Sequence, residues 1–396
     1  MGVRTLEGVD LKDRRALVRV DFNVPMANGE VTDDTRLRAA LPTIARLRAL
    51  GAKTILLAHF DRPKGRRVET MSLKPIVGPL SKLIGREVAF ADDCVGEAAR
   101  RVADGLRSGD VALFENLRFH PGEEANDPAF VQALAANGDA FVNDAFSAAH
   151  RAHASTEGLA HALPAYAGEA MRTELAALDA ALGDPQRPVL GVVGGAKVST
   201  KLELLANLVT KLDRLAIGGG MANTFLAAQG YDVGASFCEH DLVDEARRIT
   251  RAAGRCELLL PTDVVVAESL ERPATARTCS PGEVRGNERI FDAGPATVAR
   301  LTKAMDASAT LVWNGPLGVF EMPPFDKATA GAARHAADLA KAGRLIAVAG
   351  GGDTVAALNA AGVTADFTFV STAGGAFLEW LEGKPLPGVA ALEAAA

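Results

Sequence analysis

The stretch Pro188–Leu205, PVLGVVGGAKVSTKLELL, predicts a strand, a glycine turn and a helix in immediate succession. Val189–Val193 is a short apolar run of mostly β-branched residues, which is typical of a strand buried on both faces. Gly194-Gly195 ends this run, and from Val198 the apolar residues recur at helical spacing. A helix that starts after a glycine turn directs its first backbone N–H groups at an anion.

Two lysines lie at the start of this predicted helix. Lys197 and Lys201 are four residues apart, so both ammonium groups are expected to reach one ligand from the same helix entrance. The segment does not match the P-loop pattern GxxxxGK[ST], so that mechanism does not apply. Phosphate binding and a surface helix with solvated lysines both remain open on the spacing alone.

Composition narrows the class of protein. A chain of 396 residues is too long for one compact core, which predicts two domains. Its net charge of −6 argues against a nucleic-acid partner. An apolar run long enough to span a membrane and an apolar secretory segment are both lacking, so we expect a cytoplasmic protein without a membrane partner. The four cysteines are widely spaced and predict neither a zinc site nor a redox pair.

The same unit recurs along the chain: a short apolar strand, a polar or glycine break, and an Ala/Leu-rich helical stretch. This alternation predicts parallel sheets with helices on both faces. The expected strands are residues 16–20, 53–58, 111–114, 140–142, 189–193, 215–217, 257–260, 310–313, 345–349 and 367–370. A helical stretch over Glu169–Leu182 ends in Gly183-Asp184-Pro185, which indicates a hinge.

The first half of the chain places charged side chains after its strands. Ligands of open α/β sheets bind outside the carboxyl ends of the strands, and guanidinium is well suited to phosphate and carboxylate. Four arginines at such positions therefore predict an anion receptor. They are Arg36, Arg62, Arg118 and Arg151, with His59, His150 and His153 nearby. The alternative is that each arginine pairs with a local acid, because Asp33, Asp34, Asp61 and Asp144 lie close in sequence.

The second half places glycines after its strands, which suits close approach to a nucleotide and its phosphates. Gly350–Thr354 follows a strand and opens a helix, so its amides can bind phosphate. Asp353 is a candidate Mg²⁺ ligand or, alternatively, a helix N-cap. Asn314–Glu321 is a turn-rich loop whose final carboxylate is a candidate acceptor for a ribose hydroxyl. The chain lacks a GxGxxG fingerprint, which disfavours a dinucleotide-dependent dehydrogenase.

Seven longer motifs resemble the phosphoglycerate kinase family, and together they run nearly from end to end. They are VRVDFNVP (18–25), LFENLRFHPGEE (113–124), FVNDAFSAAHRAHAST (141–156), VGGAKVSTKL (193–202), GGGMANTF (218–225), WNGPLGVFE (313–321) and AGGGDT (349–354).

The resemblance implies a fold and a domain plan. The fold is α/β, with two doubly wound parallel-sheet (Rossmann-like) domains joined by a hinge, and the interdomain cleft is the active site. Residues 1–170, with a C-terminal tail of about 380–396, form a 3-phosphoglycerate-binding domain. Residues 185–379 form a nucleotide-binding domain, and residues 171–184 form the interdomain helix and hinge.

It also implies a reaction: reversible phosphoryl transfer between 1,3-bisphosphoglycerate and MgADP, giving 3-phosphoglycerate and MgATP, by a monomeric glycolytic enzyme. The acceptor carboxylate is ionised at neutral pH, so no general base is needed. The implied catalytic residues are Arg36, Lys197, Lys201, Gly374 and Gly375. The implied substrate-binding residues are Asp21, Asn23, Arg36, His59, Arg62, Arg118 and Arg151. The implied nucleotide-binding residues are Lys201, Gly218, Gly219, Gly220, Asn314, Glu321, Gly351, Gly352, Asp353 and Thr354, with Asp353 as the Mg²⁺ ligand.

Three positions depart from the family pattern. Asp61 replaces the usual glycine of His-Leu-Gly-Arg, which puts a carboxylate beside the predicted anion site and weakens it unless the side chain points outward. Asn223 stands where Phe is common. Ala373 replaces the first of three glycines, so its φ should be negative.

Three other functions remain as alternatives. Another kinase that forms an acyl phosphate on a small carboxylate is the nearest. A two-lobed solute-binding protein would carry an export signal, and a dehydrogenase would carry its dinucleotide fingerprint.

Overall fold

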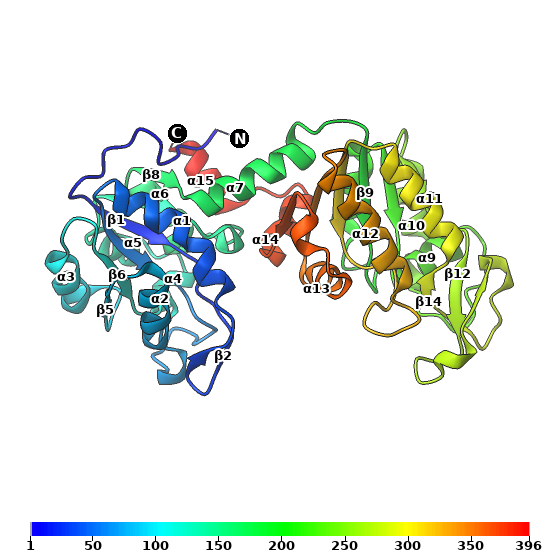
Figure 1. Ribbon diagram of the computed structural model, residues 1–396, viewed down its shortest axis with the longest axis horizontal. Helices are drawn as coiled ribbons and strands as arrows, with labels where there is room; N and C mark the ends of the chain where they lie inside the picture. The colour runs from blue at the N-terminus through cyan, green and yellow to red at the C-terminus, as the bar shows by residue number, and fades with distance from the viewer. Residues whose placement is uncertain (1, 396) are drawn as a thin grey trace. The chain divides into compact units, whose positions relative to one another are not determined.

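Two compact units make up the protein in a computed structural model that describes residues 2–395. Unit 1 contains the chain up to Ala176 and the segment from Pro385 onward, and unit 2 contains Ala177–Lys384. The division falls within helix α7 (Glu169–Leu178). Each unit has its own parallel sheet, which confirms the predicted α/β class with two parallel-sheet domains (Figure 1).

Unit 1 is built on a parallel sheet with the strand order β5-β6-β4-β1-β7-β8. The chain fills one side of β1 before it crosses to β7, so the strand order reverses between these two strands. Ligand sites form at such switch points. The strands are β1 (Arg15–Arg19), β4 (Lys53–Leu57), β5 (Val88–Ala91), β6 (Val111–Phe114), β7 (Ala140–Asn143) and β8 (Ala165–Ala167), and β2 (Met26–Ala27) pairs with β3 (Glu30–Val31) in a hairpin.

Helices cover this sheet, and the last helix of the chain returns to it. The segment α15 packs against α6 and β8 (Figure 1). The α-helices of unit 1 are α1 (Thr35–Ala49), α2 (Val77–Ile84), α3 (Gly96–Gly105), α4 (Pro121–Glu124), α5 (Pro128–Ala135), α6 (Leu159–Ala162), α7 and α15 (Pro387–Ala394). Shorter helical turns are η1 (Glu69–Met71), η2 (Lys74–Ile76), η3 (Leu117–Phe119), η4 (Phe146–Ala148) and η5 (Ala154–Gly158).

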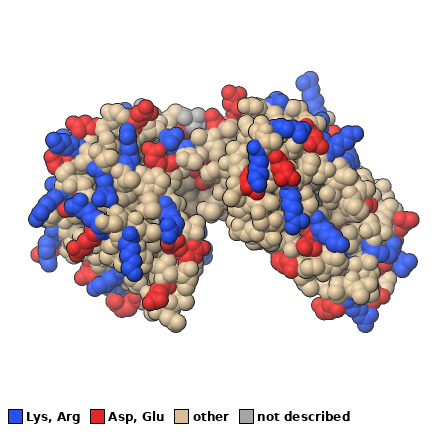
Figure 2. Space-filling model, viewed as in Figure 1, with Lys and Arg blue, Asp and Glu red and all other residues tan. Residues whose placement is uncertain are grey.

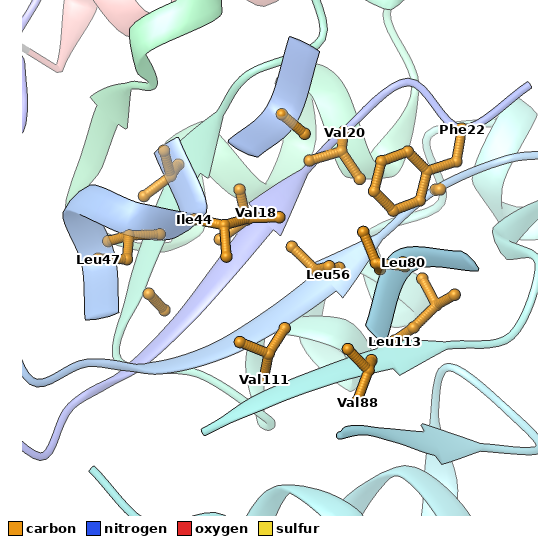
Figure 3. Packing of buried hydrophobic residues seen from close by; sticks show 14 of the residues in the cluster. Val18, Val20, Phe22, Ile44, Leu47, Leu56, Leu80, Val88, Val111 and Leu113 are labelled. Atoms are coloured by element: carbon orange, nitrogen blue, oxygen red, sulfur yellow. The ribbon is translucent and has the colours of Figure 1, made fainter. Parts of the chain in front are cut away.

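The core of unit 1 joins the sheet to helices α1 and α2. Val18 of β1, Leu56 of β4 and Leu113 of β6 lie in one fully buried cluster with Ile44 and Leu80 of the two helices (Figure 3). Because neighbouring strand residues point to opposite faces, a register slip would turn this whole set away from α1 and α2. The strands are therefore fixed supports for the loops at their carboxyl ends.

Unit 2 repeats this plan with the strand order β11-β10-β9-β15-β16-β17, all parallel. Here the switch point lies between β9 and β15. The strands are β9 (Val189–Val193), β10 (Arg214–Ile217), β11 (Glu257–Leu259), β15 (Thr310–Asn314), β16 (Ile346–Gly350) and β17 (Phe369–Ser371). A separate antiparallel sheet contains β12 (Val264–Ala267), β13 (Arg277–Cys279) and β14 (Arg289–Ala293).

The helices of unit 2 pack on its parallel sheet around a core that includes Trp313 and the alanine-rich face of α12. They are α8 (Leu202–Lys211), α9 (Gly220–Ala228), α10 (Val243–Ala252), α11 (Pro295–Asp306), α12 (Lys327–Lys341), α13 (Gly352–Ala361) and α14 (Gly374–Leu381). Shorter helical turns are η6 (Asp179–Gly183), η7 (His240–Leu242), η8 (Pro273–Thr275), η9 (Pro281–Glu283) and η10 (Thr364–Asp366).

The predicted strands are all present, with ends that differ by at most two residues. The helix predicted to begin near Val198 is wrong at its start, because α8 begins at Leu202 and residues 198–201 form turns. The sequence pattern did not predict β5, β8, the hairpin strands β2 and β3 or the antiparallel sheet. The strands β2, β3 and β8 have only two or three residues each, and β5 and β14 are only partly buried.

Basic and acidic side chains intermingle on the face seen in Figure 2. That face therefore presents no extended basic surface of the kind that nucleic acids bind. Within residues 2–395, no helix is both long and apolar enough to cross a membrane.

Candidate functional site

The switch point of unit 1 carries an arginine held by an aspartate. Asp21 lies two residues after β1, and Arg36 lies in the first turn of α1. The Arg36 guanidinium donates to the Asp21 carboxylate at 3.0 Å and to the Asn23 carbonyl at 3.0 Å. Ser147, from the loop after β7, donates to the other Asp21 oxygen at 2.6 Å. Asp21 thus fixes the Arg36 guanidinium, while 37% of the surface of the Arg36 side chain stays exposed.

A chain of hydrogen bonds links this arginine to a second one. The Asn23 side chain accepts from the Asp61 amide at 3.0 Å, and the Asp61 carbonyl accepts from Arg118 at 2.9 Å. Arg118 is only 5% exposed, and its guanidinium also pairs with Glu124 at 3.2 Å. Arg36 and Arg118 therefore belong to one connected loop cluster at the carboxyl edge of the sheet.

His59 stands against a buried arginine that the sequence analysis did not single out. The Arg19 guanidinium is 2.9 Å from His59 Nδ1, and it also donates to Ser155 and to the Val20 carbonyl. Guanidinium has no acceptor, so Nδ1 must accept and the ring proton of neutral His59 lies on Nε2. Burial, followed by the charges of Arg19, Arg118 and Arg151, lowers the pKa of His59 well below its usual value. His59 is a neutral donor at pH 7.

His153 lies at the same edge, with its Nδ1 3.9 Å from Glu123 Oε1, and the same charges act on it. Burial, then Arg118, Arg19 and Arg151, lowers the pKa of His153 to about 4. Burial, and after it the charges of Arg151 and Arg19, lower the pKa of Arg118, although Glu124 acts in the opposite direction. Such a gathering of like charge is stabilised when an anion binds.

The alternative, that each arginine pairs with a local acid, holds only in part. Arg38, not Arg36, pairs with Asp34 along α1. The Asp61 carboxylate accepts from the backbone amide of Arg62 at 2.9 Å. The Arg62 side chain is exposed, and the structure does not bring it into the hydrogen-bonded cluster described above.

Lys201 lies at the switch point of unit 2. Its ammonium donates to the Gly194 carbonyl at 2.6 Å, to the Asn314 carbonyl at 3.1 Å and to the Asn314 side-chain oxygen at 2.7 Å. Gly194 follows β9 and Asn314 ends β15, so one ammonium ties the two strands that flank the switch point. Burial lowers the pKa of Lys201 to about 8, although the Asp353 carboxylate acts in the opposite direction.

The Lys197 side chain does not lie with the Lys201 ammonium. Its ammonium lies 6.0 Å from the centre of the Phe237 ring. Because α8 begins after Lys201, the two lysines are not four residues apart on one helix face, and the geometric reason for pairing them is wrong.

A cavity of about 230 Å³ gathers most of the predicted phosphate-binding residues of unit 2. The helix starts of α13 and α14 both open onto it, so their first backbone N–H groups face one small space. Its lining comprises Lys201, Asn314, Gly315, Gly351, Gly352, Asp353, Thr354, Gly374, Gly375 and Leu378. Ala373 has φ −82°, as predicted, and the left-handed position passes to Gly374 with φ +33°.

A larger cavity of about 550 Å³ adjoins the first, because Asp353 lines both. It has an apolar wall that includes Phe237, Leu317 and Val319, with Glu321 at its edge. Gly219 and Gly220 line it as well, whereas Gly218 lies behind it and lines a small neighbouring space. A cavity of this size and polarity suits a nucleoside next to its phosphates.

Two glycines are required by the backbone geometry at the smaller cavity. A Cβ on Gly194 would lie 1.8 Å from the Pro316 carbonyl oxygen, which no side chain can tolerate. Gly351 has φ +100°, in the region that favours glycine. These positions let the strand ends approach closely enough for Lys201 to contact both.

Asp353 has the position expected of a metal ligand. Its carboxylate is exposed in the first turn of α13, at the junction of the two cavities. Mg²⁺ typically binds one or two carboxylates together with substrate phosphates. The predicted N-cap role does not apply, because the N-cap residue of α13 is Gly351.

A buried polar network that the sequence did not predict lies beneath the anion cluster. Glu123 is fully buried and accepts from the Ser155 amide at 3.0 Å and from its hydroxyl at 2.5 Å. Ser155 in turn accepts from Arg19 at 2.8 Å. The available signal was Arg19 itself, a charged residue inside the apolar run of β1.

Asn223, a departure from the family pattern, is buried in α9 beside the larger cavity. Its amide donates to the Phe237 carbonyl at 3.0 Å, which ties the cavity wall to α9. The side chain therefore has a packing role at the place where an aromatic ring is common.

Comparisons with known proteins agree over almost the whole chain. The family model for phosphoglycerate kinase matches residues 6–384. Phosphoglycerate kinase of Caulobacter vibrioides (strain NA1000 / CB15N) is 67% identical over 396 residues, which cover 99% of this chain and 100% of the relative. Phosphoglycerate kinase of Zymomonas mobilis is 61% identical over 397 residues, 100% of both chains. The solved structure of the Coxiella burnetii phosphoglycerate kinase has a TM-score of 0.93 and 41% identity, and covers 99% of each chain.

We expect the Lys201 ammonium of the free protein to titrate near pH 8. It is charged below that pH and loses its charge above it. Asp353→Asn should lower this pKa further, because the carboxylate favours the charged form. NMR of isotope-labelled lysine side chains measures both values, and Lys201→Arg identifies the resonance by its loss. A Lys201 pKa near 10.5, or a pKa raised by Asp353→Asn, would contradict this electrostatic account.

Proposed function

Because the chain belongs to the phosphoglycerate kinase family, we propose that the cation cluster of unit 1 binds 3-phosphoglycerate and the two adjoining cavities of unit 2 bind the nucleotide. The activity is that of the family: reversible transfer of a phosphoryl group between 1,3-bisphosphoglycerate and ADP, giving 3-phosphoglycerate and ATP. The observation that best supports our assignment of residues is the cavity in which Lys201 meets the starts of α13 and α14.

In unit 1, the proposed ligand is small and carries both carboxylate and phosphate charge. Arg118 and Arg151 supply positive charge, and the Nε2–H of neutral His59 supplies a donor. Arg36, held by Asp21 and Asn23, lies at the other end of the same cluster. Arg62 is exposed beside Asp61, and we include it as a contact made when the ligand binds. The cluster then offers separate donors for the two ends of 3-phosphoglycerate.

In unit 2, the nucleoside occupies the larger cavity and its phosphates occupy the smaller one. Glu321, at the edge of the larger cavity, is the proposed acceptor for ribose hydroxyls, and Gly219-Gly220 allow the base to lie close to the backbone. The amides at the starts of α13 and α14 face the phosphates. Gly218 supports this wall from behind, and Thr354 fixes the Gly315 amide at 2.7 Å.

Asp353 is the residue that would hold Mg²⁺ with the nucleotide. When bound, the metal ion supplies charge neutralisation to the phosphates. The fit rests on one exposed carboxylate at a helix start that adjoins both cavities.

Transfer needs no proton to be removed from the acceptor, because a carboxylate of pKa about 3.5 is already ionised at neutral pH. The transferring group is loose and metaphosphate-like, so catalysis consists of positioning and charge stabilisation. We assign the main stabilising charges to Lys201 and Arg36, with the Gly374 and Gly375 amides as donors. Lys197, which contacts Phe237 instead, has at most an assisting role after a change of rotamer.

The proposed ligand sites lie on different units, so the bound substrates must meet before transfer. We propose a closing motion about the predicted hinge at residues 171–184, which also excludes water from the reacting group. A cytoplasmic location and a monomeric state stay predictions from the sequence and the family resemblance.

Lys201→Ala should lower kcat by about 100-fold or more with a smaller change in KM, because it removes a charge used in the transition state. The measurement is a coupled assay of ATP- and 3-phosphoglycerate-dependent acyl phosphate formation. Lys211→Ala is the matched control, since Lys211 is exposed at the other end of α8 and should leave kcat unchanged. An unchanged kcat with a raised KM would assign Lys201 to binding alone. Activity on other small carboxylates in preference to 3-phosphoglycerate would contradict the substrate assignment.

Asp61 allows a test of the anion cluster. Its φ is +53°, a value that glycine adopts more readily, and its exposed carboxylate lies beside the Arg62 amide. Asp61→Gly and Asp61→Asn both remove a negative charge near the proposed ligand. Each should tighten 3-phosphoglycerate binding by about two- to fivefold, as for an exposed charge interaction. Calorimetric titration at two salt concentrations checks this, and the gain should shrink at high salt. Weaker binding by both variants would contradict the placement of the substrate.

A further inference from the structure

A cysteine, a histidine and an aspartate from two separate segments meet at one edge of unit 1. Asp93 and Cys94 follow β5, the edge strand of the sheet, and His120 immediately precedes α4. One potential ligand atom from each residue lies within 4.8 Å of the others. Cys94 is buried, whereas Asp93 and His120 are half-buried, so the group is reachable from solvent on one side.

The cluster is held in place by its surroundings. His120 Nε2 lies 2.7 Å from Asp93 Oδ1, and the His120 ring stacks on Phe130 with centroids 5.1 Å apart. The Asp93 carboxylate accepts from the Cys94 amide at 2.7 Å and from the Val95 amide at 3.3 Å. These contacts fix the carboxylate and limit rotation of the imidazole, as the second shell of a metal site does.

The local field favours a cation at this place. The Asp93 carboxylate lies among the three potential ligand atoms, and its Oδ1 is 2.7 Å from His120 Nε2. This carboxylate supplies the negative charge that attracts a metal ion. Arg67, a basic residue nearby, is itself paired with Glu69 and Glu115.

A nucleophilic role fits the cluster poorly. A reactive cysteine needs an accessible, electropositive setting, whereas Cys94 is 1% exposed and faces acidic groups. Mg²⁺ is also a poor match, since it prefers oxygen ligands. Thiolate, imidazole and carboxylate together are the donors of a zinc site, and three protein ligands leave a fourth position for water.

We propose that Asp93, Cys94 and His120 bind a borderline-soft divalent metal ion, Zn²⁺ above all, at a site separate from the proposed Mg²⁺ position on unit 2. Binding converts the Cys94 thiol to a thiolate, and its proton passes to solvent. The hydrogen bond between His120 and Asp93 is replaced by bonds to the metal. Cysteine spacing did not predict this site, because its ligands come from segments about 26 residues apart.

Bound metal would also restrain the segment that carries Arg118. Arg118 lies two residues before His120, and η3 and α4 lie on either side of that histidine. The metal would connect this segment to the turn after β5. Zn²⁺ should therefore raise the melting temperature of the protein even without substrates.

The test is a titration of the full metal-free chain with Zn²⁺ in excess Mg²⁺, in competition with a chromophoric chelator. We expect one Zn²⁺ per chain. Cys94→Ser and His120→Gln should each weaken binding by at least about 100-fold, and Asp93→Asn by at least about tenfold. Co²⁺ in place of Zn²⁺ should give thiolate-to-metal charge-transfer and tetrahedral d–d absorption in the wild type but not in Cys94→Ser.

Cys238→Ser is the matched control, because Cys238 and His240 form another cysteine–histidine pair, in unit 2, with Sγ and Nδ1 3.8 Å apart. This variant should bind Zn²⁺ as the wild type does. Circular dichroism checks the fold, and His120→Gln, at a half-exposed side chain, tests the site even if Cys94→Ser unfolds. Zn²⁺ binding that survives both His120→Gln and Asp93→Asn, or that is lost only in Cys238→Ser, would overturn the proposal. So would the absence of stoichiometric binding by the wild type.

Discussion

The partly buried ammonium of Lys201 is the interaction on which the arrangement of unit 2 depends. A charge removed from water needs compensating hydrogen bonds, and here three come from Gly194 and Asn314 at the ends of β9 and β15. Those strand ends can meet because the residues after them are glycines. The same turns open the space into which the starts of α13 and α14 direct their amides. The position of Lys201 and the shape of the phosphate cavity therefore depend on the same glycine turns.

In unit 1 several cations lie close together in the absence of a ligand, and their mutual repulsion must be offset. Arg19 and Glu123 share Ser155 in the interior, and their charges partly neutralise one another beneath the surface. Arg19 also determines the tautomer of His59 and keeps that ring neutral. Arg36, Arg118 and Arg151 therefore lie above a buried polar layer, and a bound anion would replace their mutual repulsion with attraction. The proposed site of unit 1 therefore consists mainly of side chains, whereas that of unit 2 combines backbone amides with Lys201 and Asp353.

The sequence was most informative where a pattern is local. Buried apolar runs such as Val189–Val193 predicted the strands closely, because period and length are properties of a few adjacent residues. The sequence was least informative where contacts between distant segments determine the local structure. Helix α8 begins at Leu202 and not near Val198, because the Ser199 hydroxyl donates to Glu239 and does not cap the helix. The ion-pair partner of Arg36 is Asp21 rather than Asp33 or Asp34. This pairing arises because the fold places the end of β1 beside the start of α1, which a local sequence pattern does not show. The family motifs carried the assignment of substrates, which composition and spacing left open.

We propose that Lys201 and Arg36 together stabilise the negative charge of the group in transfer. The decisive experiment is a crystal structure with MgADP, 3-phosphoglycerate and a planar aluminium fluoride mimic of that group. We expect the Lys201 ammonium and the Arg36 guanidinium both to donate to the fluoride, with the carboxylate and the ADP oxygen on opposite sides. A mimic contacted by neither residue would contradict it.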